Sequence, residues 1–219
     1  MNRTQKIPGV SLLCIVLIAT ILSTSLMAQS TVDSSERERR SAVFDDQTNN
    51  RPKLDAPQRT DGGYSEFWDR AALAAFPVDT SDEVVLGSVS NAQAFLSNDH
   101  TSIYTEFSIS PERVLKGDSS TEYTILARGG SLFGPSGKIL SYRGGSHNTE
   151  ILTVGARYVL FLQKVPGTQG YRAIKVWLLV NGHPKAVEPE DIKAAKSGID
   201  KTSAMTEEAF VAAVQAASH

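Results

Sequence analysis

The chain has 219 residues, of which 41% are hydrophobic and 21% charged, and its formal net charge is −2 at pH 7. That charge is too small, and of the wrong sign, for a protein that binds nucleic acid without sequence preference. The single cysteine, Cys14, lies close to the N-terminus, which excludes a disulfide framework and a thiolate metal site. We therefore expect a fold that is held together by its apolar core.

The first 28 residues have the pattern of a secretory signal peptide. Arg3 and Lys6 supply positive charge, an apolar stretch covers residues 11–22, and Ala28 occupies the expected cleavage position. The pattern predicts an exported protein, in the periplasm, in the cell envelope or secreted, whose mature chain begins near Gln29. The alternative is an uncleaved membrane anchor, because the mostly apolar stretch from Val10 to Ala28, about 19 residues, approaches the roughly 20 residues that span a bilayer.

The rest of the chain divides into three parts. Residues 29–62 are polar and mixed in charge, and such a segment buries too little apolar surface to offset the entropy lost on ordering, so we predict a disordered linker. Residues 63–188 are expected to form the folded domain, and residues 189–219 a C-terminal helical segment. At the start of the domain, apolar residues from Trp68 onward recur at helical spacing, which predicts a short helix that ends before Pro77.

From residue 83 the pattern is typical of β-strands. We predict strands at residues 83–96, 103–115, 123–128, 138–142, 157–165, 171–180 and 185–187. Gly87 indicates a bulge in the first strand, and Pro111 indicates a bend or a sheet edge in the second. Asn181 and Gly182 are typical of a type I′ turn between the last two strands.

The chain ends in a predicted helix. Thr206 is the expected N-cap, and Glu207 follows it at the positive end of the helix dipole. Phe210 and Val214 then lie on one apolar face. A weaker helical pattern precedes it at residues 189–197. The strands, turns and helices together predict a mainly β fold, namely a small antiparallel barrel or curled sheet with a short N-terminal helix and a C-terminal helix.

Five short runs between residues 82 and 162 carry a resemblance to known proteins: D-E-V-V-L-G-S-V, F-L-S-N-D, Y-T-E-F, V-L-K-G and G-A-R-Y-V-L-F-L. They resemble an uncharacterised family of exported bacterial proteins. Their layout is also similar to the oligonucleotide/oligosaccharide-binding (OB) barrel of the netrin module and of tissue inhibitors of metalloproteinases. The resemblance implies an OB-like barrel. It does not imply the inhibitory mechanism, because the mature chain lacks the N-terminal Cys with which such inhibitors bind zinc.

The sequence contains no familiar catalytic pattern. Gly117, Asp118 and Ser119 follow a strand, but no Asp-x-x-His accompanies them, as a GDSL-type esterase would require. Residues 134–138 resemble part of a phosphate loop without its first Gly or its final Ser or Thr. The four histidines are scattered along the chain. We therefore predict no catalytic residue, no cofactor and no metal site.

One stretch is a candidate for binding a partner. From Tyr123 through Thr149 the sequence has no acidic residue and is rich in glycine. Mobile basic loops on a rigid barrel are a common place for binding residues. The candidate binding residues are Arg128, Lys138, Tyr142, Arg143 and His147. The alternative is an ordinary solvated hairpin.

These observations favour an exported, non-enzymatic binding or interaction module. We expect its partner to be a protein or an anionic envelope polymer, with no nucleic-acid partner and no membrane insertion after signal cleavage. Two alternatives stay open: an envelope hydrolase with an unrecognised site, and a structural component of the envelope that residues 29–62 tether. A deep pocket with converging polar residues would favour the enzyme, and an exposed basic or apolar patch would favour the binding module.

Overall fold

The structure is a computed structural model that describes residues 33–48, 51, 53–54, 76–134, 136–142, 152–187, 192, 196 and 201–218. The predicted signal peptide and the predicted helix before Pro77 lie outside these residues. The weak helical pattern at residues 189–197 lies almost entirely outside them. Arg143 and His147, two of the candidate binding residues, also fall outside.

The described strands follow the predicted order. They are β1 (Glu83–Leu96), β2 (Ile103–Lys116), β3 (Tyr123–Arg128), β4 (Gly130–Phe133), β5 (Ile139–Tyr142), β6 (Arg157–Lys164), β7 (Tyr171–Val180) and β8 (His183–Ala186). The described helices are α2 (Ser34–Ala42), the short 3-10 helix η1 (Thr202–Ala204) and α5 (Glu207–Ala216). The sequence did not predict β4, which pairs with β5 in a separate two-stranded sheet.

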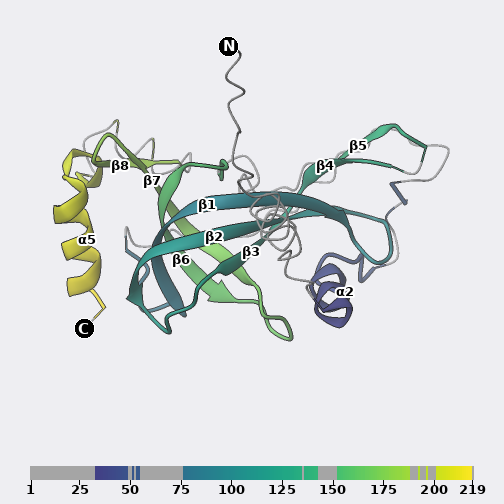
Figure 1. Cartoon of the computed structure of the whole chain (residues 1–219), viewed down its shortest axis with the longest axis horizontal. Coiled ribbons are helices and arrows are strands. Elements are labelled where there is room, and N and C mark those ends of the chain that lie inside the picture. Colours follow the sequence, from purple (N-terminus) through teal and green to yellow (C-terminus); the bar gives the residue numbers. More distant parts are fainter. Residues whose placement is uncertain are drawn as a thin grey trace, which may run out of the picture. The chain divides into compact units, whose positions relative to one another are not determined.

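The large sheet closes on itself. Its strands are ordered β3-β2-β1-β6-β7-β8, and β3 also pairs with β7, where Ile125 lies opposite Tyr171. The ring therefore runs from β1 through β2, β3, β7 and β6 back to β1, as Figure 1 shows. All pairs in the ring are antiparallel except β3 with β7. The predicted small, mainly β, OB-like barrel is confirmed.

Two irregular positions allow β1 and β2 to curve around this ring. The register of the two strands shifts between Leu86 and Gly87, which confirms the predicted bulge. A Cβ at Gly87 would lie 2.6 Å from the Ser110 carbonyl oxygen, so only glycine fits there without a shift of the backbone. β2 pairs with β3 only as far as Ile109. Pro111 therefore lies at a sheet edge, where its missing N–H costs no ladder hydrogen bond.

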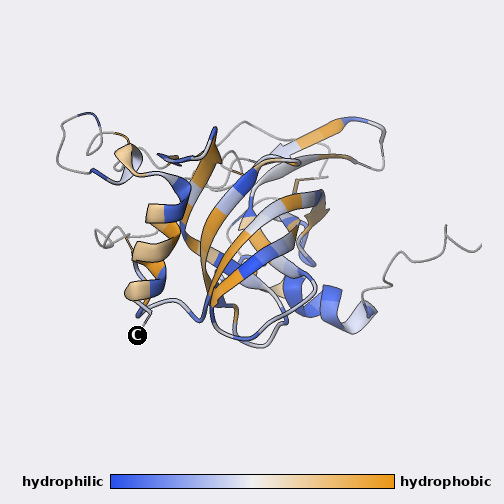
Figure 2. Cartoon of the chain, turned by 60° about the vertical axis from the view of Figure 1, so that its left-hand side comes forward, coloured by the Kyte–Doolittle hydropathy of each residue, from blue (hydrophilic) through white to orange (hydrophobic). Residues whose placement is uncertain are grey.

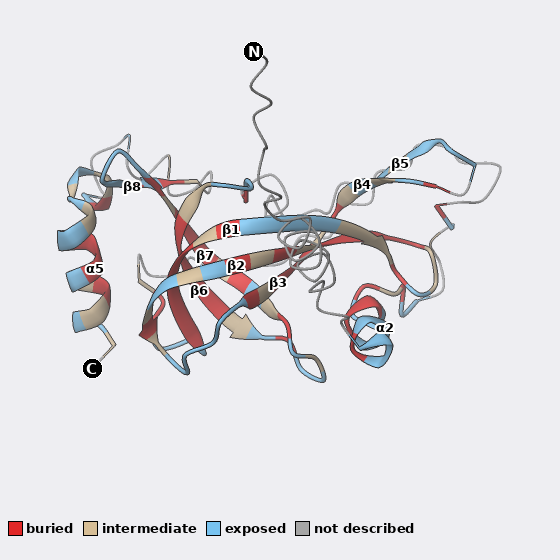
Figure 3. Cartoon of the chain, viewed as in Figure 1, coloured by how far each residue is buried: buried red, intermediate tan, exposed pale blue. Residues whose placement is uncertain are grey.

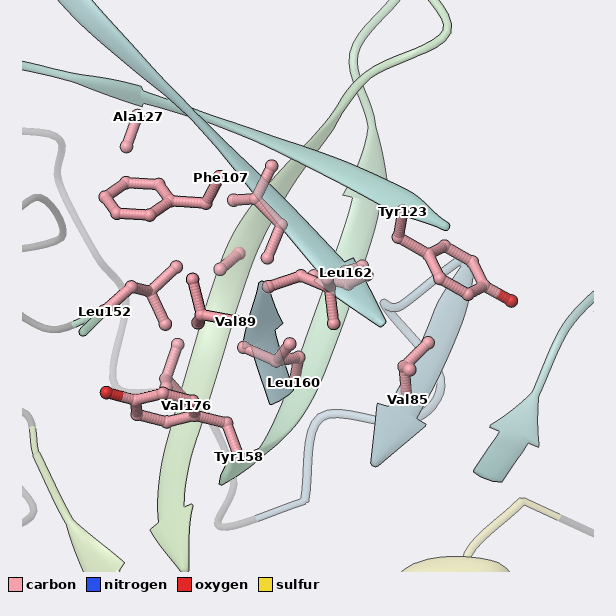
Figure 4. Packing of buried hydrophobic residues seen from close by; sticks show 13 residues of the cluster. Val85, Val89, Phe107, Tyr123, Ala127, Leu152, Tyr158, Leu160, Leu162 and Val176 are labelled. Carbon is pink, nitrogen blue, oxygen red and sulfur yellow. The ribbon is translucent and has the colours of Figure 1, made fainter. Parts of the chain in front are cut away.

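The barrel is filled by side chains from alternate positions of its strands. The inward cluster consists of Val85, Val89, Phe107, Ile109, Tyr123, Ile125, Ala127, Leu152, Tyr158, Leu160, Leu162, Ala173 and Val176. Figure 4 shows these side chains converging between the strands. Because successive side chains of a strand point to opposite faces, β6 places Leu160 and Leu162 inside the barrel and Phe161 outside it.

The outward side chains of β6 and β7 pack against α5. Phe161 and Trp177 are fully buried there with Phe210 of the helix, and the rings of Trp177 and Phe210 lie 5.5 Å apart. Figure 3 shows the buried residues of α5, which are Phe210, Val211 and Val214, on the side of the helix that faces the sheet. The predicted N-cap is confirmed, because the Thr206 hydroxyl accepts a hydrogen bond from the Ala209 amide. This second apolar layer explains why β6 is apolar on both faces.

The turn between β7 and β8 has the predicted conformation. Asn181 has a φ of 52° and Gly182 a φ of 76°. Type I′ turns require positive φ at both central residues, and Asn followed by Gly is the pair that adopts this most readily.

Helix α2 corrects the prediction of a disordered linker over residues 29–62. That prediction was wrong for residues 34–42, which are helical, and Figure 3 marks the buried positions of this helix. Its buried residues are Glu36, Arg40 and Ser41, all of them polar. The helix is held by ion pairs and hydrogen bonds, so it needs no apolar period, and an apolar period was the signal sought in the sequence. None of the described helices is long and apolar enough to cross a membrane.

Candidate functional site

The outer face of β2 and β3 carries a row of aromatic and charged side chains. Phe107 points into the barrel, so Tyr104 and Glu106 lie on the opposite, outer face of β2. The register places Arg128 opposite Tyr104 and Leu126 opposite Glu106 on β3. We call these four residues, Tyr104, Glu106, Leu126 and Arg128, the outer face.

A segment from the N-terminal part of the chain lies on the outer face. We call residues 35–46 the cover, which consists of most of α2 and the turn that follows it. The Arg40 guanidinium lies 2.9 Å from a Glu36 oxygen within the cover and 2.9 Å from a Glu106 oxygen on the outer face. The side chains of all three residues are almost fully buried, at 6%, 5% and 11% exposure. Arg40 therefore joins the cover to β2 through a shielded ion pair.

An aromatic stack forms the second contact between the cover and the outer face. The Phe44 ring lies parallel to the Tyr104 ring, with centroids 4.7 Å apart and an interplanar angle of 9°. Phe95 of β1 packs 5.6 Å from Tyr104, and the Arg128 guanidinium lies 5.4 Å from the centre of the Phe44 ring. Leu126 and Val165 complete this cluster. The Phe44 ring of the cover thus contacts both an aromatic and a cationic side chain of the outer face.

The two loops beside the outer face also hold the cover. In the β6–β7 loop, the Gln169 amide donates a hydrogen bond of 2.7 Å to Glu36. In the β1–β2 loop, Asp99 accepts one of 2.6 Å from the Asp46 amide, and Ser102 donates one of 2.7 Å to the Phe44 carbonyl. OB barrels bind their ligands with the face of their second and third strands and with the corresponding loops. The cover therefore occupies the surface that OB barrels use for ligands.

The contacts shift the pKa values of acidic groups at this surface. Burial acts to raise the pKa of Asp99, but hydrogen bonds from Ser97, Thr101 and the Asp46 amide outweigh it and hold that pKa at about 2. The pKa of Glu36 is lowered in the same way, because hydrogen bonds from Gln169, Arg39 and Arg40 outweigh burial. Both carboxylates are therefore charged at neutral pH, as acceptors for cations and amides must be.

Burial works in the other direction on two neighbouring groups. It raises the pKa of Tyr104 to about 12, with a further contribution from the Glu106 charge. Burial also raises the pKa of Asp45, whose carboxylate accepts a 3.0 Å hydrogen bond from the Asp99 amide. Tyr104 is therefore a neutral ring at physiological pH and acts at this site through stacking.

The structure separates the candidate binding residues that the sequence indicated. Arg128 lies on the outer face against Phe44. Lys138 is exposed in the turn between β4 and β5. Tyr142 is buried, and its hydroxyl accepts a 3.3 Å hydrogen bond from Arg51, so it serves packing. The described part of this stretch therefore does not form one binding flank.

The hairpin of β4 and β5 presents a second surface. Phe133 lies opposite Ile139 at its far end, and their side chains are 76% and 65% exposed. The side chains on the other side of the hairpin, Leu132 and Leu140, pack on a small cluster that includes Ile103. This surface is distinct from the outer face.

Sequence reasoning missed the main residues of the outer face and of the cover. The missed residues are Glu36, Arg40, Phe44, Tyr104 and Glu106. Two signals were present: Glu36 and Arg40 are four residues apart, which is the spacing of a helical ion pair, and Phe44 is an aromatic residue in a polar segment.

Comparisons with known proteins assign no family to this chain. The sequence matches no protein-family model and no curated protein. Among the described residues, no group of three or more His, Cys, Asp or Glu side chains is placed to hold a metal ion. The geometry of the outer face is therefore the basis for a functional proposal.

Proposed function

We propose that this protein is an exported, non-enzymatic binding module that holds a peptide segment of a partner protein on its outer face. The observation that carries the proposal is that this face already holds a peptide segment, the chain's own cover. The cover binds through a buried arginine and a stacked phenylalanine four residues later, together with backbone hydrogen bonds to the two adjacent loops. The partner segment would carry the same pair of side chains.

The charge at this surface favours a peptide over an anionic polymer. Glu106 and Asp99 would become available as carboxylates when the cover leaves, and Glu106 already accepts a guanidinium. A buried carboxylate without its cation is costly, so a ligand must bring a cation to the same place. A peptide with an arginine followed four residues later by an aromatic residue satisfies both the carboxylate and the Tyr104 ring.

A peptide added in trans tests this proposal. The Arg40→Ala/Phe44→Ala variant of the mature chain should loosen the cover and bind a labelled peptide of residues 33–48. Fluorescence anisotropy should show binding at least about tenfold tighter than to wild type, because a tethered segment competes at a high effective concentration. The same peptide with Arg40 and Phe44 replaced by Ala is the matched control and should not bind.

A variant of the outer face separates specific from non-specific binding. Glu106→Gln, added to the variant with the loosened cover, should weaken peptide binding because it removes the charge that pairs with Arg40. Equal binding of the wild-type and the substituted peptides, or no effect of Glu106→Gln, would contradict the proposal. Circular dichroism should show that each variant remains folded.

Export is the other part of the proposal. The positive N-terminal residues, the apolar stretch and Ala28 support a signal peptide. N-terminal sequencing of the native protein should find a mature chain that begins near Gln29. An intact N-terminus at Met1 would instead favour an uncleaved anchor.

A further inference from the structure

The tip of the β4–β5 hairpin has an unusual surface for a hairpin of a globular protein. Among the described residues, Phe133 and Ile139 are the most exposed large apolar side chains, and they lie opposite each other. The turn that joins them is closed by a 2.8 Å hydrogen bond from the Gly134 amide to the Lys138 carbonyl. Lys138, which is also exposed, directly precedes Ile139. Figures 1 and 2 show the hairpin extending away from the barrel.

The exposure of these side chains does not come from loose packing of the hairpin. Leu132 and Leu140 pack on the cluster at the base of the hairpin, so the strand alternation turns Phe133 and Ile139 outward. A Cβ at Gly130 would lie 2.5 Å from the Thr105 hydroxyl oxygen, which shows how closely the first residue of β4 lies against β2. The hairpin is fixed at its base, and its apolar tip points outward.

We infer that this tip docks on a lipid surface that carries anionic headgroups. Two side chains offer far less than the roughly 800 Å² per partner that a stable protein interface buries. They suit a shallow contact instead, in which apolar side chains enter the boundary between headgroups and acyl chains to a depth of about 5–10 Å. Lys138 can extend its ammonium group toward the headgroups while its neighbour Ile139 enters the boundary.

The charge of this region identifies the kind of lipid. The hairpin, residues 130–142, contains no acidic residue in its sequence, and Lys138 stands in its turn. Anionic headgroups attract such basic residues within about one Debye length of the surface. The contact is peripheral and lies on a different surface from the outer face. The sequence predicted no membrane insertion after signal cleavage. The proposed contact departs from that prediction only in that the side chains of Phe133 and Ile139 enter the headgroup boundary.

Vesicle binding by the full mature chain tests this inference. We expect the wild type to sediment with vesicles that contain phosphatidylglycerol and not with vesicles of phosphatidylcholine alone. Binding should weaken several-fold at high salt, because the electrostatic attraction is screened. Phe133→Ser/Ile139→Ser should reduce binding at least about tenfold, because apolar insertion supplies most of the affinity. Lys138→Ser should reduce it less.

A matched control uses exposed valines elsewhere. Val154 and Val180 are 54% and 40% exposed and lie outside the hairpin, so Val154→Ser/Val180→Ser should bind vesicles as wild type does. Circular dichroism should show that both double variants remain folded. Three results would overturn the inference: no binding of the wild type to anionic vesicles, equal binding to neutral vesicles, or an equal loss in the two double variants.

Discussion

The barrel interior and the cover are held in place by different kinds of contact. The inward cluster of the barrel is apolar throughout, with Val159, Leu160 and Phe161 of β6 all fully buried on one face or the other. The cover is attached by an ion pair from Arg40 to Glu106, one ring stack and hydrogen bonds to two loops. The barrel interior excludes water from a continuous apolar core, whereas the cover is attached mainly by charged and polar groups that pair with groups of the barrel.

This difference has a consequence for function. Burial of apolar surface stabilises the barrel by about 25 cal/mol per Å². No molecule in solution replaces these internal contacts, so the barrel stays closed. A buried ion pair contributes little net free energy, because the cost of removing both charges from water offsets their attraction. A segment held in that way can be replaced by another segment that supplies the same charge and ring. The cover is therefore the part of the chain that we expect to exchange.

Not every polar contact in the protein belongs to an exchangeable segment. At the end of the barrel where β1 begins, the Lys116 ammonium donates hydrogen bonds of 2.8 and 2.7 Å to the Val78 and Ser81 carbonyls. Asp82 accepts one of 2.7 Å from the Lys164 amide. These contacts fix the entry of β1 into the barrel. They give a structural role to Asp82 and Lys116, which lie in two of the runs that carry the sequence resemblance.

The largest effect should come from the core. Phe161→Ala removes a fully buried ring between the barrel and α5, so the free energy of unfolding should fall by about 3–5 kcal/mol. Urea unfolding followed by circular dichroism measures this loss. Val180→Ala is the control, because Val180 is 40% exposed and its loss should stay within about 0.5 kcal/mol. A loss below about 1 kcal/mol for Phe161→Ala would mean that the α5 layer is not part of the core.

A smaller loss is expected for Gly117→Ala, at the fixed polar end of the barrel. Gly117 has a φ of +92°, and a Cβ there would lie within 2.5 Å of the Glu83 carboxyl carbon. Backbone strain of this kind costs about 1–3 kcal/mol. Gly137→Ala is the matched control, since Gly137 also has a positive φ, +74°, but open space around it. If both variants lose the same free energy, the contact with Glu83 contributes nothing.

The sequence was sufficient to predict the strands of the barrel because apolar and polar residues alternate along them as they do in half-buried strands. Gly87 at a bulge, Asn181 in a type I′ turn and Thr206 as an N-cap are local signals with local causes, and the structure confirms each of them. Apart from β4, the described strands from Glu83 onward were predicted within one or two residues. The parallel pairing of β3 with β7, which closes the ring, has no local signal. The residue pattern alone therefore left a barrel and a curled sheet both open, and the resemblance to OB barrels favoured the barrel.

The cover could not be predicted by the same means. Most of its buried residues are polar, and burial of the Glu36–Arg40 pair becomes favourable only when Arg40 also meets Glu106, which lies 66 residues further along the chain. Tyr142 lies on a short strand that the sequence did predict, but its side chain is buried in a cluster with Leu54 and Ile103, which are distant in the sequence. Partners distant in sequence decide both cases, and a single sequence does not reveal them.

Arg40→Ala should loosen the cover and leave the barrel intact. The loss in unfolding free energy should be smaller than that of Phe161→Ala. The reason is that the cover can detach, and the Glu36 and Glu106 carboxylates are then solvated by water. Hydrogen exchange of the Asp46 amide, which bonds to Asp99, should accelerate about tenfold or more, which corresponds to about 1.4 kcal/mol. Arg39→Ala is the matched control, because Arg39 contacts the same Glu36 from a half-exposed position. Similar exchange in both variants would contradict a special role for Arg40.

Acid should weaken the cover through Asp99 and Glu36. Both have pKa values below their ordinary ones, so their stabilising contribution is present above those ordinary values and is lost as the pH falls; for Asp99 this occurs between 3.8 and about 2. Asp45 opposes this trend: its pKa is raised by burial, so ionisation of its carboxyl group destabilises the fold, and acid relieves that cost. The NMR shift of the Asp46 amide should titrate near pH 2, and Asp99→Asn should abolish that titration. A midpoint near 3.8 would mean that the hydrogen bonds to Asp99 do not persist in solution.

The smallest effect concerns the two basic residues that the sequence placed together and the structure separates. Arg128 lies over the Phe44 ring, and a cation–π contact of this kind contributes about 0.5–1 kcal/mol at an exposed site and more when shielded. Lys138→Ala should change the free energy of unfolding by no more than about 0.5 kcal/mol, because Lys138 is exposed. A double-mutant cycle between Arg128→Ala and Phe44→Ala should therefore give a coupling free energy that the cycle between Lys138→Ala and Phe44→Ala does not. Zero coupling in the first cycle would show that Arg128 does not hold the cover. Phe44 would then be held by Tyr104 and the apolar side chains of the same cluster, and a partner peptide would need only its ring and its arginine to replace the cover.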